Sequence, residues 1–200
     1  MVATLEKTLS ETTLYPYARG TDLFFYDFNI EGRDDLIPSI SEDFVTIPIK
    51  NTDNLLSKIS DYSNVKINNL YVLGHGKSGE LKIGSDVVNT ESLIAFAKNN
   101  ISFDVEKVTL LSCEVGQNVD FIKAFSNVFN CDVNYSKELV GHKSLGGSWD
   151  LDTFNFETGL TDNDSFNSSS LPFPSSVINN WEFTLSVTID APDIAAFVDD

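Results

Sequence analysis

Two residues of the chain stand where a thiol and an imidazole can work as a catalytic pair. His75 follows the apolar run YVLG, and Cys113 follows the apolar run VTLLS. A thiol attacks a carbonyl group as its thiolate, and a neighbouring imidazole lowers the thiol pKa or takes its proton. Gly74 and Gly76 flank the histidine and allow sharp turns and the close approach of a peptide. We therefore expect the backbone N–H groups of Gly76 and Cys113 to form an oxyanion hole.

The elements that must position this pair are short apolar strands that alternate with helices. This alternation predicts an α/β fold with a mostly parallel sheet of about six strands between two helical layers, a three-layer α/β/α sandwich. A right-handed crossover between two of the strands would bring His75 and Cys113 to the same edge of the sheet. The expected strands are 21–30, 43–49, 67–76, 105–113, 131–136 and 146–157, with helices at 51–62, 90–100 and 117–130 and a hairpin at 77–89.

Composition along the chain suggests four parts. Residues 1–20 are polar and are expected to form a leader or an added edge, and residues 21–160 hold the strand and helix pattern. Residues 161–180 are rich in Ser, Asn and Pro, which is typical of a linker. Residues 181–200 begin with the apolar alternation WEFTLSVTID, which predicts an extra edge strand or the start of a following module.

The charge balance limits the classes of partner. The 200 residues carry a formal net charge of −17, which should repel nucleic acid and anionic membrane surfaces. The same charge could attract a basic protein segment, or calcium as a regulator. The proposed chemistry requires no cofactor. The two cysteines do not form a disulfide framework, and no Cys or His spacing indicates a zinc site.

Targeting signals are not evident in the sequence. No apolar run approaches the roughly 20 residues that span a bilayer, so we expect no membrane insertion. The N-terminal segment lacks the apolar stretch of a Sec signal peptide. We expect an extracellular or cell-surface location reached by a non-Sec route, with the cytoplasm as the alternative.

The segments around His75 and Cys113 resemble the caspase-like clan of cysteine peptidases. YVLGHG and VTLLSC match the clan's pattern of apolar strands that end in His-Gly and in a small residue followed by Cys. The clan includes caspases, legumain, gingipains, clostripain, separase and the self-processing domains of large bacterial toxins. The stretch 21–157 also resembles an uncharacterised bacterial domain of this clan, found near the N-terminus of very large repeat-containing surface proteins. FFYD, GHGKSGELKIG, LLSCEVG and LGGSWDLD carry this second resemblance.

The resemblance implies a cysteine endopeptidase that uses His75 and Cys113 and processes itself, a linked chain or a partner protein. In this clan the first specificity pocket is lined from the end of the first strand, the nucleophile loop and the strand that follows. Those regions contain Asp27, Glu114, Trp149 and Asp150. An acidic pocket, with Asp27 as its main charge, would select Arg or Lys at the cleaved position. Toxin-type members of the clan prefer an apolar residue instead.

Other residues receive structural or weaker assignments. His142 lies in the glycine-flanked segment LVGHKSLGG and is expected to be a solvated loop residue, whereas Cys131 begins a strand and is expected in the core. Arg19, in the leader, is a candidate self-cleavage position.

Two other functions remain open. The first is a catalytically silent caspase-like module that only binds a neighbouring region. The second is a flavodoxin-like domain that binds a small molecule. The carboxylates of DFNIEGRDD, after the first strand, disfavour the phosphate site that such a domain would need.

Overall fold

The central element of the computed structural model, which describes residues 20–186, is a seven-stranded sheet of order β10-β9-β8-β7-β3-β1-β2. The five strands from β2 to β8 in this order pair in parallel, and β9 and β10 pair antiparallel. The strands are β1 (Thr21–Asp27), β2 (Phe44–Ile49), β3 (Lys66–Leu73), β7 (Asp104–Leu111), β8 (Asp132–Tyr135), β9 (Leu151–Phe154) and β10 (Thr161–Phe166). The chain therefore has the mixed α/β fold with a mostly parallel sheet that the sequence predicts.

A second, three-stranded sheet follows β3 directly. It contains β4 (His75–Lys77), β5 (Glu80–Ile83) and β6 (Asp86–Asn89) in antiparallel order. His75 thus begins a new strand just beyond the end of β3, where the sequence predicts only the end of a strand and a later hairpin.

Five α-helices lie within the described residues: α1 (Arg33–Leu36), α2 (Leu55–Ser60), α3 (Thr90–Ala97), α4 (Val119–Phe129) and α5 (Ser175–Ile178). Asn118 caps α4 by accepting hydrogen bonds from the backbone of Asp120 and Phe121. Asn89 and Ser92 form a reciprocal capping box on α3, so this helix begins at Thr90, where the sequence predicts its start. None of these helices is long and apolar enough to cross a membrane.

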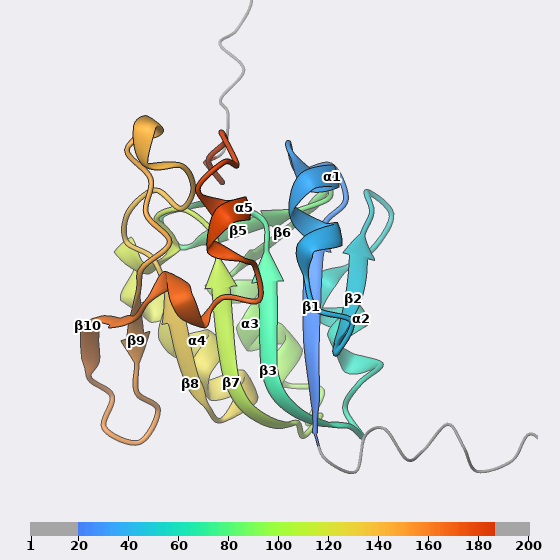
Figure 1. Ribbon diagram of the computed structural model, residues 1–200. Helices are drawn as coiled ribbons and strands as arrows, with labels where there is room; N and C mark the ends of the chain where they lie inside the picture. The colour runs from blue at the N-terminus through green and yellow to red at the C-terminus, as the bar shows by residue number, and fades with distance from the viewer. Residues whose placement is uncertain (1–19, 187–200) are drawn as a thin grey trace, which may run out of the picture.

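Alternate residues of β1 enter two different apolar clusters on the two faces of the sheet. Leu23 and Phe25 belong to the cluster that includes buried residues of α2, α3 and α4, whereas Phe24 belongs to the cluster that includes Phe173 and Trp181. Figure 1 shows α3 and α4 behind the sheet and α5 in front of it. Both faces of the sheet are therefore covered.

The order of the strands confirms the expectation that positions the site. β3 and β7 are direct neighbours in parallel register, as the crossover rule predicts. β2 lies at the edge of the sheet, which fits the proline at position 48.

The segment 161–180 differs from its description as a linker. It contains β10, a 3₁₀ turn at Ser168–Ser170 and α5. Leu171, Phe173 and Ile178 are buried, because they cover the face of the sheet that α3 and α4 leave open. Residues 1–19 and 187–200 lie outside the described residues, and with them the leader, Arg19 and most of the expected last strand or module.

Candidate active site at the ends of β3 and β7

The carboxyl ends of β3 and β7 bring the histidine segment against the cysteine segment. Leu73 and Leu111 are register partners, and the Gly74 N–H donates to the Leu111 carbonyl at 3.2 Å. A Cβ atom at Gly76 would overlap the Cys113 carbonyl oxygen and Ser112 Oγ, so only glycine fits at this contact. The two predicted catalytic segments therefore touch through their backbones.

Cys113 is fully buried in this structure. Its Sγ accepts a hydrogen bond from the Val140 N–H at 3.1 Å, and the thiol can donate to the Val140 carbonyl at 3.6 Å. Burial raises the pKa of the Cys113 thiol to about 11, while hydrogen bonds from the backbone of Val140 and Leu185 act in the opposite direction. The thiol is therefore largely protonated at neutral pH in this state.

His75 is half-buried at the start of β4 and faces the last described residue. Its Nδ1 lies 3.0 Å from the Ser186 carbonyl oxygen. Because a carbonyl oxygen only accepts, Nδ1 carries the proton in this contact, and Nε2 of the neutral ring is left as the basic atom.

The segment Phe183–Ser186 lies as an extended chain between the histidine strand and the loop that follows β8. On the loop side, the His142 N–H donates to the Phe183 carbonyl and the Leu185 N–H donates to the Val140 carbonyl, both at 2.9 Å. On the histidine side, the Gly76 N–H donates to the Leu185 carbonyl at 3.0 Å. In Figure 1 this C-terminal segment lies beyond the carboxyl ends of β3 and β7. It thus occupies the edge of the sheet where the site was expected.

The expected oxyanion hole is partly engaged in this arrangement. Gly76 supplies one N–H to the Leu185 carbonyl, as described above. The Cys113 N–H, the second expected donor, makes no backbone hydrogen bond within residues 20–186. Ser112 Oγ, which lies against Gly76, is buried and likewise has no hydrogen-bond partner among the described residues.

Asp27, the expected pocket charge, is buried at the end of β1. Its Oδ1 accepts from the Asn29 N–H at 2.8 Å, and its Oδ2 accepts from the Gly84 N–H at 2.9 Å. These bonds join β1 to the turn between β5 and β6, so both carboxylate oxygens already have backbone partners. A role for Asp27 in substrate selection stays a prediction that this geometry does not favour.

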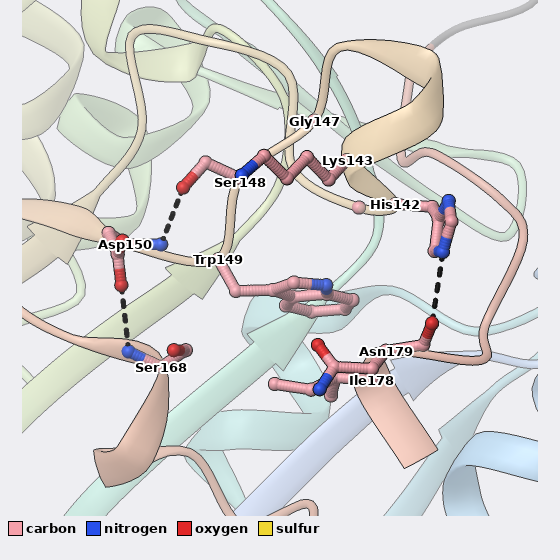
Figure 2. Close-up of a pocket in the computed structure, with 10 residues that line it drawn as sticks. His142, Lys143, Gly147, Ser148, Trp149, Asp150, Ser168, Ile178 and Asn179 are labelled. Atoms are coloured by element: carbon pink, nitrogen blue, oxygen red, sulfur yellow. Dashed lines mark hydrogen bonds between the residues drawn. The ribbon is translucent and has the colours of Figure 1, made fainter. Parts of the chain in front are cut away.

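The other expected pocket residues lie in two places. Glu114 has a left-handed backbone (φ 57°), and its carboxylate accepts from the Gln117 side chain at 3.1 Å. Trp149 and Asp150 line a cavity of about 520 Å³ beside His142 (Figure 2). The Trp149 indole lies across this cavity, and Asp150 accepts a hydrogen bond from the Ser168 N–H at 2.9 Å. Their roles in binding substrate remain predictions.

The second histidine and the second cysteine make structural contacts. His142 Nδ1 accepts from the Ser144 N–H at 3.2 Å, and Nε2 donates to the Asn179 carbonyl at 3.0 Å. Cys131 is buried in the cluster formed with α4, and burial raises the pKa of its thiol to about 12. No group of three or more His, Cys, Asp or Glu residues that could hold a metal ion occurs between residues 20 and 186.

Sequence reasoning missed the residues that hold the C-terminal segment. Val140 and Gly141 contribute through their backbones, which leaves little trace in side-chain patterns. Gly141 has a φ of +140°, and a Cβ there would overlap the Phe183 carbonyl oxygen. The alternation in WEFTLSVTID predicts an extended segment, of which the structure describes residues 181–186, but the pattern gives no indication of where that segment docks.

Comparison with known proteins identifies a family but no activity. The model of the family described as Domain of unknown function (DUF4347) matches residues 23–185. No curated protein matches the chain. The matched region ends at Leu185, so it includes nearly all of the segment that docks between His75 and the loop after β8.

Proposed function

We propose that this chain, which belongs to the DUF4347 family, is a cysteine endopeptidase with His75 as its base and Cys113 as its nucleophile. The observation that carries the proposal is the contact between the Gly76 and Cys113 backbones at one end of the parallel sheet. We further propose that the fold is the three-layer α/β/α sandwich of the caspase-like clan. The two apolar clusters on opposite faces of the sheet support that assignment.

The proposed chemistry is nucleophilic attack on a peptide carbonyl. His75 takes the thiol proton, and the thiolate of Cys113 attacks the carbonyl carbon. The Gly76 and Cys113 N–H groups stabilise the oxyanion that develops, which in other hydrolases contributes about 10²–10³-fold per donor. The imidazolium then returns a proton to the departing amine.

The proposed substrate is an extended peptide segment of the same chain, a linked chain or a partner protein. The backbone groups of Val140 and His142 supply the donor and acceptor that a strand adding at this edge requires. The cavity beside Trp149 and Asp150 is proposed to receive a side chain of that segment.

A catalytically silent caspase-like binding module is the second candidate. The observation that favours it is the complete burial of Cys113, together with a thiol pKa of about 11. In that case the site would hold a peptide strand without cleaving it.

A peptide panel distinguishes the two functions. Fluorogenic peptides with Leu, Arg, Lys, Asn or Asp at the cleaved position are incubated with the wild type and with Leu185→Asp, which releases the docked segment. Turnover that is lost in Cys113→Ala and retained in Cys131→Ala supports the peptidase. Absence of Cys113-dependent turnover of every peptide, in both the wild type and Leu185→Asp, together with a chain that stays intact, supports the silent module.

A further inference from the structure

We infer that the chain cleaves itself at the peptide bond between Leu185 and Ser186, an inference that rests on the proposed peptidase function. Three groups surround this one bond. The Gly76 N–H donates to the Leu185 carbonyl at 3.0 Å, Cys113 lies in the same buried apolar cluster as Leu185, and His75 Nδ1 donates to the carbonyl of Ser186 at 3.0 Å.

The order of these groups along the bond matches the order that hydrolysis requires. The oxyanion donor binds the Leu185 carbonyl, which is the group that is attacked, and the nucleophile packs in the same buried cluster as the Leu185 side chain. The imidazole lies on the Ser186 side, where the amine departs and needs a proton. No other peptide bond in residues 20–186 has both Gly76 and His75 as hydrogen-bond partners across it.

The backbone on both sides fixes the register of this segment. Leu185 N–H and Phe183 C=O pair with the loop residues Val140 and His142, and Gly141 and Thr184 form an antiparallel bridge. Gly76 and Ser186 form a parallel bridge on the other side. A shift by one residue would turn the Leu185 side chain to the opposite face, so this pairing selects one peptide bond.

The side chain at the cleaved position also fits the site. Leu185 is fully buried and belongs to the apolar cluster that includes Leu73, Leu111, Val140 and Trp149. An Arg or Lys there would bury a charge whose expected partner, Asp27, already accepts two backbone hydrogen bonds. The site therefore selects an apolar residue, not the basic residue that Asp27 suggests in the sequence.

The reaction consumes one water molecule. Cys113 Sγ forms a bond to the Leu185 carbonyl carbon as its proton passes to His75, and collapse of the oxyanion breaks the bond to the Ser186 nitrogen, which takes that proton. Water, activated by the imidazole, then attacks the thioester. This step restores the thiol and leaves a carboxylate on Leu185, and the segment from Ser186 to Asp200 departs with a free amine.

The fragment that ends at Leu185 should keep its own end in the site. The Leu185 side chain and the bonds to Val140 and Gly76 do not depend on Ser186. Self-cleavage would therefore separate the following chain while the new C-terminus continues to cover Cys113.

The test is intact-mass spectrometry of the purified 200-residue chain over a time course. We compare wild type, Cys113→Ala, Leu185→Asp and the conservative variant Leu185→Met, with circular dichroism to verify folding. Fragments 1–185 and 186–200 in the wild type and in Leu185→Met, and their absence in Cys113→Ala and Leu185→Asp, are the expected result. The peptide panel described above is run on the same preparations.

The outcomes separate this inference from the proposed function. If peptides are hydrolysed in a Cys113-dependent manner but the chain stays intact at Leu185, or is cut elsewhere such as after Arg19, the inference is wrong and the peptidase remains. If neither peptides nor the chain are cut, both are wrong. Cleavage at Leu185 that persists in Cys113→Ala would also overturn the inference, because it would show an external protease.

Discussion

At the scale of single residues, Cys113 is fully buried, and the docked segment 183–186 contributes to this burial. The thiol is buried by its own chain, and this burial raises the thiol pKa to about 11. A thiol in this state is poorly reactive toward external reagents, whereas a peptide that is already docked needs no access from solvent.

The rate at which iodoacetamide alkylates Cys113 should show directly whether the docked segment covers the thiol. In the wild type we expect slow reaction of both Cys113 and Cys131 with iodoacetamide. The rate at Cys113 should rise with pH through 9 to 11, because the thiolate fraction grows until the pH reaches the raised pKa. In Leu185→Asp, reaction at Cys113 should be at least about tenfold faster at pH 7.5, since water reaches the thiol and its pKa falls. Peptide mapping by mass spectrometry measures both sites.

Cys131 is the internal control for this measurement. It lies in the cluster with α4, away from the segment, and should stay protected in both proteins. Equal acceleration at both cysteines would mean that Leu185→Asp loosens the whole fold, and no change at Cys113 would mean that Leu185 does not cover the thiol.

Replacement of His75 should stop cleavage without unfolding the chain. We expect His75→Ala to reduce self-cleavage by about 10²–10⁴-fold, the usual contribution of a general acid–base group. Imidazole added to the buffer should restore part of the rate, because it can occupy the space left by the side chain and carry the proton. Full activity in His75→Ala, or loss without any rescue in a protein of lowered melting temperature, would contradict a catalytic role.

The meeting of the His75 and Cys113 segments at one edge of the sheet could be predicted from sequence, because both residues follow apolar strands and a crossover joins those strands. The contacts of Asp27 could not be predicted in this way. Asp27 looks like a pocket charge at a strand end, but its carboxylate joins two turns by hydrogen bonds to residues 29 and 84, and the second of these contacts is far away in the sequence.

At the scale of elements, the loop after β8 converts the end of the sheet into a strand-binding edge. Gly141 makes this possible because its lack of a side chain lets the Phe183 and Thr184 backbones approach closely. We therefore expect Gly141→Ala to prevent docking of the C-terminal segment. Self-cleavage should be lost, and Cys113 should become accessible to alkylation.

Gly146→Ala is the matched control for that variant. Gly146 lies in the same loop and also has a positive φ (+80°), but a Cβ there would meet no atom within 4 Å. Both variants strain the backbone, Gly146→Ala by roughly 1–2 kcal/mol and Gly141→Ala by roughly 1–3 kcal/mol, whereas only Gly141→Ala blocks the segment. An equal loss of self-cleavage in the two variants would show that backbone strain, not the docked segment, controls the site, and full self-cleavage in Gly141→Ala would show that the Cβ does not prevent docking.

The adjacency of β3 and β7 was predictable because parallel strands joined by one crossover commonly lie side by side. The elements within 161–180 were not predictable in the same way. Their few apolar residues are separated by Ser, Asn and Pro, so no helical or strand period is visible. Only the open face of the sheet gives those residues a place to pack.

At the scale of the whole molecule, residues 161–186 both cover one face of the sheet and reach the candidate site. Residues of α5 and its flanks fill one face of the sheet, and the chain then runs between β4 and the loop after β8, with backbone hydrogen bonds to both. Contacts of this kind link positions such as 75 and 186, and no local pattern in the sequence encodes them. The fold class follows from local alternation, whereas the docked strand depends on the complete tertiary structure.

Two shortened chains should separate the fold from the docked strand. A chain that ends at residue 185 should keep a cooperative thermal transition within a few degrees of the full chain. The reason is that every residue described as buried lies at or before Leu185. A chain that ends at residue 160 loses Leu171, Phe173, Ile178 and Trp181 from one face. Each such side chain contributes about 1.5–3 kcal/mol by burial. The combined loss is comparable to the roughly 5–15 kcal/mol that stabilises a typical domain.

Differential scanning calorimetry and circular dichroism measure both chains against the full protein. We expect the chain that ends at 160 to lose its cooperative transition or to aggregate, since the apolar face that contains Phe24 and Tyr71 is then uncovered. A stable, cooperative transition in that chain would show that residues 161–180 are indeed a linker. If instead the chain that ends at 185 unfolds as well, residues beyond Leu185 must support the fold, and a cut after Leu185 would inactivate the protein because the remaining body could not stay folded.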